Sequence, residues 1–210
     1  MSSWTFSAVT SLAGCWRIAI PLVERGVQVD GIDLSPSMLA KLRSKPGSEK
    51  MEIVQGNFAD VGITGKYRLI YLIFNTFYNL MTQEEQVRCF INVDQHLEEG
   101  GVFVIEGGTP TEFYNLTNNQ YVHTEAIETN QVRFDVAKFD PVEQLLVENH
   151  VTLSENGIRF NPIVTRYVWA SEMDLMGRIA GLRLEERWGT WTREPFTGES
   201  RNCISVYVKG

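Results

Sequence analysis

Hydrophobic and polar residues follow two different periods along the first hundred positions of the chain. Short apolar runs bounded by turn residues predict strands at residues 4–9, 27–32, 51–54, 67–74 and 102–106. Between these runs, the spacing typical of an amphipathic helix predicts helices at 15–25, from Pro36 to just before Lys45, and at 82–96. Strands that alternate with helices are typical of βαβ units, so we expect an α/β fold with a parallel sheet.

Capping residues support these boundaries. Ser35 is a suitable N-cap for the helix that begins at Pro36, and Thr82 with Glu85 forms a capping box. Gly26 is expected to end the first helix, although Pro21 weakens that prediction unless it lies near the first turn.

The period falls to two between residues 120 and 169. We interpret this region as an antiparallel meander of three or four strands, with a hairpin turn at 155–157. Ser171 and Gly181 are the expected ends of one more helix, and two antiparallel strands close the chain. The chain therefore divides into a core at 1–111, an insertion at 112–170 and a C-terminal part at 171–210.

Composition limits the possible partners. The net charge of −7 argues against duplex nucleic acid or an anionic membrane as the main partner. Three scattered cysteines and three scattered histidines predict a reduced, cytoplasmic protein without a disulfide framework or a metal site. The run from Leu12 to Cys15 matches a lipoprotein cleavage box, but residues 1–10 hold no Lys or Arg and no long apolar stretch, so we do not interpret it as a signal.

Polar residues follow the predicted strands at the edge where ligands bind in open α/β sheets. Asp33 ends the second strand, nineteen residues after Gly14, which suits a carboxylate that binds a ribose diol. The alternative is that Asp33 only caps the helix at Pro36. Asn57 and Phe58 offer hydrogen bonds and a ring to an adenine, although a Gly-Asn pair is also a common turn. Residues 74–79 lie after the central strand and either face the cleft or cap the next helix.

The order of these segments resembles a known family. The runs GIDLSPSMLAKLR, VQGNFAD, YRLIYLIFNTFYNL and LEEGGVFVIEGG are similar to the core of class I S-adenosylmethionine (SAM) dependent methyltransferases. The resemblance extends from about Arg17 to the C-terminus and is strongest to bacterial small-molecule enzymes with a β insertion, including N-methyltransferases of amino sugars. It implies a Rossmann-like, mostly parallel seven-stranded sheet of order 3-2-1-4-5-7-6, and an insertion that serves as a lid or dimerisation element. A homodimer is one expected arrangement.

The resemblance also implies residue roles. Asp33 would bind the ribose, Leu34 and Met38 would flank the adenine, and Asn57 with Phe58 would meet its edge. Phe74, Asn75 and the loop glycine Gly14 would line the methionine end of SAM.

One motif departs from the family pattern. The acidic position at the end of the first strand holds Thr10, and the three glycine positions hold Leu12, Gly14 and Trp16. Three explanations stay open: an altered or shortened start of the chain, a member that has lost catalysis, or a remodelled loop that still binds SAM. The departure predicts weak SAM binding, because side chains replace glycines that touch the cofactor.

The acceptor site is less defined by the sequence. His123 and Tyr78 are candidate bases, and Tyr114, Trp188 and Trp191 are candidate lining residues, although packing explains such aromatic residues equally well. The expected function is methyl transfer from SAM to a small molecule. The alternatives are an inactive binding or scaffold protein and a nicotinamide-dependent oxidoreductase of similar architecture.

Overall fold

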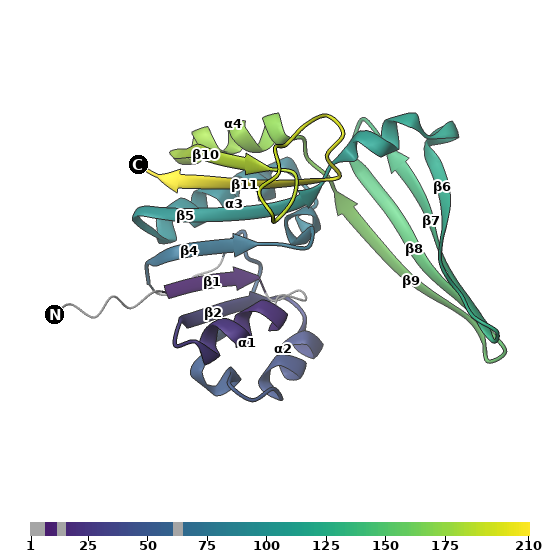
Figure 1. Cartoon of the computed structure of the whole chain (residues 1–210), viewed down its shortest axis with the longest axis horizontal. Coiled ribbons are helices and arrows are strands. Elements are labelled where there is room, and N and C mark those ends of the chain that lie inside the picture. Colours follow the sequence, from purple (N-terminus) through teal and green to yellow (C-terminus); the bar gives the residue numbers. More distant parts are fainter. Residues whose placement is uncertain (1–6, 12–15, 61–64) are drawn as a thin grey trace.

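The computed structural model describes residues 7–11, 16–60 and 65–210. They form an α/β core and a separate long β-sheet beside it (Figure 1). In chain order the helices and strands are β1 (Ser7–Ser11), α1 (Trp16–Glu24), β2 (Gln28–Asp33), α2 (Pro36–Arg43), β3 (Ile53–Gln55), β4 (Tyr67–Leu72), α3 (Gln83–His96), β5 (Leu97–Gly108), β6 (Gln120–Ile127), β7 (Gln131–Asp140), β8 (Leu145–Ser154), β9 (Gly157–Arg166), α4 (Ala170–Ala180), β10 (Leu182–Trp188) and β11 (Asn202–Lys209).

The core sheet has the strand order β10-β11-β5-β4-β1-β2-β3, which is the order that the family resemblance implies. Its strands from β3 to β5 pair in parallel, whereas β11 is antiparallel to both β5 and β10. The sheet is therefore mixed rather than uniformly parallel. Within the described part of the chain, no helix is long and apolar enough to cross a membrane.

The two faces of the sheet carry separate hydrophobic clusters. Ile70 and Leu72 of β4 pack with α3 and α4, and Tyr71 and Ile73 pack with α1 and α2. Because successive side chains of a strand point to opposite faces, a strand that is covered on both sides is apolar on both faces. This explains the apolar run from Leu69 to Ile73, which follows the half-buried Arg68.

Local capping explains where α2 and α3 begin. The Thr82 side chain accepts a hydrogen bond from the Glu85 amide at 3.1 Å, which is one half of the predicted capping box. The Ser35 hydroxyl accepts from Met38 at the start of α2. The prediction for Ser171 is wrong: Trp169 is the N-cap of α4 and makes no side-chain capping bond. The Gly181 residue adopts a positive φ and ends α4, as predicted.

Some strand boundaries also differ from the predictions. β1 is described from Ser7, and the predicted start at residue 4 lies outside the described residues. β3 is shorter than expected, and β4 ends at Leu72 because Phe74 and Asn75 adopt positive φ angles. A left-handed backbone conformation cannot continue a strand.

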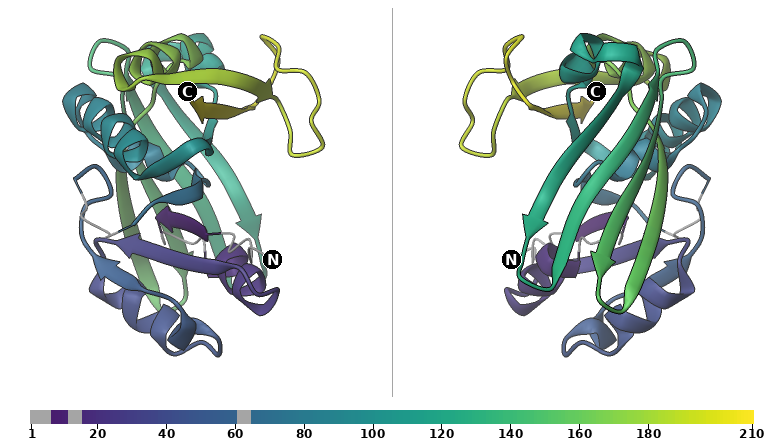
Figure 2. Two further views of the ribbon diagram at one scale, coloured as in Figure 1. Left: turned by 90° about the vertical axis from the view of Figure 1, so that its left-hand side faces the viewer. Right: turned by 90° about the vertical axis from the view of Figure 1, so that its right-hand side faces the viewer.

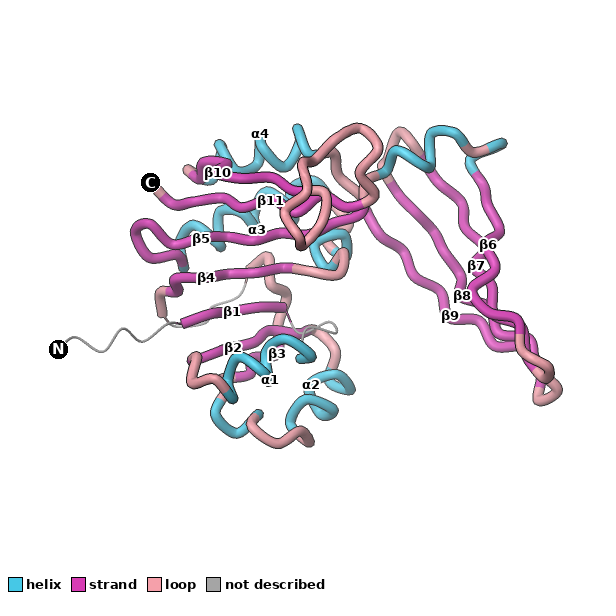
Figure 3. Tube along the Cα trace, in the orientation of Figure 1, coloured by secondary structure: helices cyan, strands magenta, loops and turns pink. Residues whose placement is uncertain are grey.

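The insertion is a four-stranded antiparallel sheet of order β6-β7-β8-β9, which we call the insert sheet. It stands at the edge of the core where the parallel strands end (Figures 1 and 3). Its long strands cross this side of the core from the level of α4 towards the level of α1 (Figure 2). Register pairing puts Asp135 and His150 on the face that lines the cleft described below. The opposite face exposes apolar side chains: Val122, Val136, Val147, Leu153, Ile158, Phe160 and Val164.

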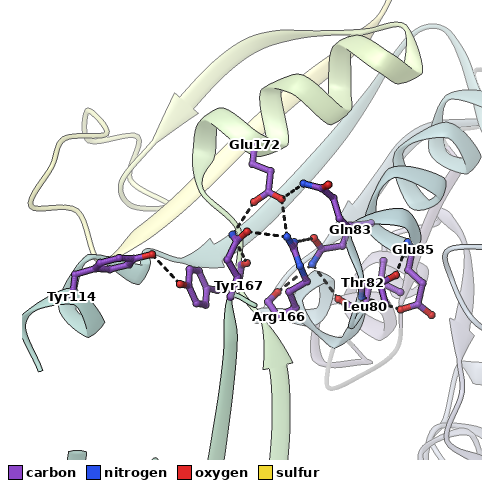
Figure 4. Close-up of polar contacts among 10 residues, drawn as sticks. Leu80, Thr82, Gln83, Glu85, Tyr114, Arg166, Tyr167 and Glu172 are labelled. Carbon is purple, nitrogen blue, oxygen red and sulfur yellow. Dashed lines mark hydrogen bonds and ion pairs between the residues drawn. The ribbon is translucent and has the colours of Figure 1, made fainter. Parts of the chain in front are cut away.

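A polar cluster around the buried Arg166 and Gln86 joins the insert sheet to the core (Figure 4). Arg166, at the end of β9, donates to Glu172 of α4 at 2.9 Å and to Gln144 at 2.9 Å, and also bonds Gln86 of α3. Gln83 of α3 donates to Glu172 at 2.8 Å. Because these residues come from α3, from α4, from the turn between β7 and β8 and from the end of β9, the cluster fixes where the insert sheet leaves the core.

Candidate functional site

The loops after β2, β3 and β4 lie at one edge of the core sheet. Asp33 pairs with Gln55 across β2 and β3, and the Gly56 amide donates to the Asp33 carbonyl at 3.1 Å. The loop that holds Asn57 therefore lies directly beside Asp33. β1 separates β2 from β4, so Asp33 and Phe74 flank the end of β1. The glycine loop that follows, with Gly14, lies outside the described residues.

The two carboxylate oxygens of Asp33 have different environments. Its Oδ1 atom accepts a hydrogen bond from the Ser35 amide at 2.7 Å. Ser35 is the N-cap of α2, so the interpretation of Asp33 as the helix cap is wrong. Its Oδ2 atom is buried and has no hydrogen-bond partner among the described residues. Burial raises the pKa of Asp33, whereas the Ser35 amide lowers it. A buried carboxylate oxygen without a partner is costly unless a ligand supplies a donor.

The other residues predicted around the adenine lie near Asp33 but differ in exposure. Leu34 is 60% exposed and Met38 is half-buried in the first turn of α2. Asn57 uses its side-chain oxygen within its own turn, where it accepts from the Ala59 amide at 3.0 Å. Phe58 packs against the core cluster. These contacts give Asn57 and Phe58 structural roles beside any role toward a ligand.

Phe74 and Asn75 form a tight turn after β4. Their φ angles are 57° and 59°. The Phe74 amide donates to Glu106 at 3.0 Å, and the Asn75 side chain accepts from the Gly108 amide at 2.6 Å. Asn75 thus ties this turn to the end of β5. The Arg17 guanidinium lies 5.5 Å from the centre of the Phe74 ring, which is half exposed.

A cleft of about 440 Å³ lies between this turn and the insert sheet. Phe74, Asn75 and Tyr78 line it from the core, whereas Glu148 and His150 of β8 line it from the insert sheet. Phe113 and Tyr167 add aromatic surface. The cleft is thus partly aromatic and has carboxylate and imidazole groups on one wall.

Two titratable residues of this wall have defined partners. The Tyr121 hydroxyl donates to Glu148 at 2.6 Å. The His150 Nδ1 atom lies 2.5 Å from Asp135 Oδ1, and its Nε2 atom lies 4.0 Å from Glu148 Oε2. The hydrogen bond with Asp135 raises the pKa of His150; partial burial opposes this, and the nearby charges of Asp135, Glu148 and Glu125 add to the rise.

The two candidate bases, Tyr78 and His123, lie in different environments. Tyr78 lines the cleft, but its buried hydroxyl donates to the Gly108 carbonyl at 2.7 Å. Burial raises the pKa of Tyr78, so its phenol stays protonated. His123 is exposed on the edge strand β6 and does not line this cleft. Sequence reasoning missed His150, because its place opposite Asp135 depends on the register of β7 and β8.

The candidate lining aromatics lie elsewhere. Tyr114 bonds Tyr167 through its hydroxyl at 3.0 Å, and its ring packs on Phe139. The Trp188 ring lies under the Arg193 guanidinium, and Trp191 donates to Glu106 at 2.8 Å. None of the three lines the cleft between the Phe74 turn and the insert sheet.

Comparison with known proteins identifies the family. A family model described as a methyltransferase domain matches residues 13–101. The chain is 34% identical to the CcbJ methyltransferase from Streptomyces caelestis, with a TM-score of 0.89; the match covers 97% of this chain and 84% of that one. It is 26% identical over 187 residues to the cypemycin N-terminal methyltransferase of a Streptomyces species, which covers 88% of this chain and 76% of that protein.

A further structure shares the fold at lower identity. SAM-bound CalS10, an amino pentose methyltransferase from Micromonospora echinaspora, is 19% identical with a TM-score of 0.73, and the match covers 98% of this chain and 84% of that one. Of the two enzyme classes considered from the sequence, these relatives favour the methyltransferase over the oxidoreductase. The chain belongs to the SAM-dependent methyltransferases.

Proposed function

We propose that this methyltransferase transfers the methyl group of SAM to a nitrogen atom of a small-molecule amine. The observation that carries the proposal is the cleft between the Phe74 turn and the insert sheet, which joins aromatic rings to the carboxylate of Glu148. A cleft of this size accommodates a small molecule. A carboxylate beside aromatic faces favours a basic nitrogen, which carries a positive charge before it reacts.

The residues at the sheet edge fit the expected cofactor. The buried Oδ2 atom of Asp33, which has no partner among the described residues, is placed to accept hydrogen bonds from a ribose diol. In this arrangement Leu34 and Met38 flank the adenine, and Asn57 with Phe58 meet its edge. Phe74 and Asn75 lie on the other side of the end of β1, where the methionine part would lie with Gly14 beside it.

The chemistry assigns few tasks to the protein. When SAM is bound, its sulfonium supplies a methyl group that is already electrophilic. The residues of the cleft align the acceptor nitrogen with that methyl group and exclude water. Glu148 attracts the cationic amine, and the Phe74, Phe113 and Tyr167 rings bury its apolar parts. The names of the relatives, an N-terminal methyltransferase and an amino pentose methyltransferase, support a nitrogen acceptor.

The altered glycine motif favours a second candidate, a binding or scaffold protein without catalysis. Leu12 and Trp16 stand where the family has glycine. Assays at millimolar SAM separate the two candidates, because weak binding is then overcome by concentration.

The test is a matched acceptor panel. The chain is incubated with millimolar SAM and with amino sugars and short peptides, each beside an analogue in which a hydroxyl replaces the amine. Mass spectrometry then measures S-adenosylhomocysteine and the methylated product. We expect turnover with the amines only. Turnover with the hydroxyl analogues would overturn the nitrogen acceptor, and no turnover with any acceptor would favour the non-catalytic candidate.

The carboxylate is tested separately. Glu148→Gln keeps the size of the side chain and removes its charge, so we expect KM for the amine to rise about tenfold, as for a lost charge-assisted contact. Glu143→Gln is the matched control, because Glu143 is exposed at the turn before β8 and does not line the cleft. An unchanged KM in Glu148→Gln would remove Glu148 from the acceptor site.

A further inference from the structure

Methylation of an amine requires a proton acceptor. An alkylamine has a pKa near that of lysine, about 10.4, so at neutral pH almost all of it is protonated and has no lone pair to react. A base within the cleft would supply the reactive form at the place where it is needed, and an imidazole is the usual side chain for this task near neutral pH.

Among the residues that line the cleft, His150 has the geometry of such a base. Asp135 lies directly opposite it on β7 and is buried, and its Oδ1 atom lies 2.5 Å from His150 Nδ1. This contact orients the ring and leaves Nε2 as the remaining nitrogen. Nε2 is turned toward Glu148, which also lines the cleft, at 4.0 Å.

The groups that surround His150 come from all four strands. Glu148 lies on β8, the strand that holds His150, and Asp135 and Arg133 lie on β7. Glu125 lies on β6, and one of its carboxylate oxygens is within 4.8 Å of polar side-chain atoms of His150 and Asp135. Arg159 and the neutral Asn161 lie on β9. The two arginines are exposed, whereas Asp135 is buried and bonded to the ring. Asp135 is therefore the strongest single influence on the protonation of His150.

We propose that His150, oriented by Asp135, accepts the proton of the acceptor ammonium, and that Asp135 is its positioning residue. This inference rests on the proposed nitrogen acceptor. The N–H electron pair stays on nitrogen as a lone pair when the proton moves to His150 Nε2. That lone pair forms the bond to the methyl carbon while the carbon–sulfur bond breaks and its electrons stay on sulfur. The products are the methylammonium, S-adenosylhomocysteine and the proton on His150, which passes to solvent.

The pH profile of kcat/KM tests the proposal, with an amine that the wild-type chain methylates. His150 accepts a proton only when it is neutral, so the profile should fall as the pH drops through its pKa, which lies above the ordinary 6.5. The pH at which kcat/KM falls should be the same for amines of different basicity, whereas a fall caused by protonation of the acceptor would shift with the pKa of the acceptor. Asp135→Asn should shift this fall in kcat/KM to lower pH, because the contact that raises the pKa of His150 is lost.

Two substitutions at His150 give independent readouts. His150→Gln should lower kcat at neutral pH by a hundredfold or more, the usual scale of general-base catalysis, with a small change in KM. His150→Ala should recover activity when imidazole is added, which a structural role would not produce. His96→Gln is the matched control, since His96 lies at the end of α3 and bonds Asn92 away from the cleft.

The possible outcomes are distinct. A wild-type chain that methylates no amine refutes the proposed function, and this inference falls with it. A chain that methylates amines but whose His150 variants keep the wild-type rate and pH profile refutes the inference alone. Assays are run with EDTA: loss of wild-type activity would mean that Glu125, Asp135 and His150 hold a metal ion, and would overturn the role of His150 as a base. Circular dichroism of each variant confirms that it is folded.

Discussion

At the scale of single residues, the two carboxylate oxygens of Asp33 differ. One accepts a hydrogen bond from the amide of Ser35, the N-cap of α2, and the other is buried without a partner among the described residues. Asp33 is therefore not the helix cap itself. The unpartnered oxygen leaves the ribose-ligand interpretation as a prediction.

Asp33→Ala should weaken SAM binding at least tenfold, about 1.4 kcal/mol, because the charge-assisted hydrogen bonds to the ribose are lost. Isothermal titration calorimetry measures the change. Asp140→Asn provides the control, since Asp140 is an exposed carboxylate that caps the turn after β7. SAM affinity that is unchanged in Asp33→Ala would remove Asp33 from the cofactor site.

The residues of the acceptor site were harder to foresee. Tyr78 lines the cleft, which was one of the two alternatives that the sequence left open for residues 74–79. His123 and His150 stand on either side of Asp135 on the same face of the insert sheet. Only His150 lines the cleft, so the choice between them depends on which strand lies next to the core. The sequence showed alternation in β7 and β8 but did not reveal which residues stand opposite each other.

At the scale of elements, the attachment of the insert sheet depends on Arg166. Its guanidinium is 8% exposed and bonds residues of α3, α4 and the turn between β7 and β8. Burial alone would raise the pKa of Glu172, but hydrogen bonds from Gln144, Gln83 and Arg166 lower it overall. The cluster thus holds Glu172 in its charged form.

Arg166→Met should destabilise the fold by about 3 kcal/mol or more, because a buried carboxylate loses its cation. Urea unfolding measures this difference. Arg183→Met is the matched control: Arg183 pairs with Glu185 at the surface, where an ion pair contributes about 0–1 kcal/mol. Equal effects of the two substitutions would show that the Arg166 cluster adds no more than a surface pair.

The same cluster should give the wild-type chain a dependence on acid. The pKa of Glu172 in the folded state lies below its ordinary 4.5, so the unfolded state binds the proton first. The contribution of Glu172 to stability is complete above about pH 4.5 and is lost as the pH falls through the lower folded pKa. Urea unfolding at pH values from about 3 to about 7, on both sides of the ordinary carboxyl pKa, measures this loss of stability. The loss should be present in the wild type and smaller in Glu172→Gln. Equal slopes would contradict it.

At the scale of the whole molecule, the departure in the glycine motif predicts that the chain binds SAM weakly. Thr10→Glu, Leu12→Gly and Trp16→Gly, introduced together, should raise SAM affinity at least tenfold, because they restore a partner for the SAM ammonium and remove bulk from the loop. Calorimetry on both chains measures the change. Micromolar binding by the unmodified chain would show that its loop holds SAM in another way.

The outer face of the insert sheet is a second feature of the whole molecule. Its exposed apolar side chains agree with the period-two pattern, which predicted an apolar face in need of cover. The inner face lines the cleft, so a lid, one of the two roles expected for the insertion, would use that face. A homodimer, the other expected arrangement, would use the outer face and stays a prediction.

The sequence by itself determined the α/β class, the order of the core elements, the antiparallel insertion and the residues that follow each parallel strand. These features depend on local periodicity, capping and turn chemistry, which neighbouring residues carry. Only the tertiary structure placed His150 against Asp135, turned one oxygen of Asp33 away from solvent, and joined the insertion to the core through Arg166. Such contacts depend on strand register and on packing between distant segments, and no local pattern specifies them.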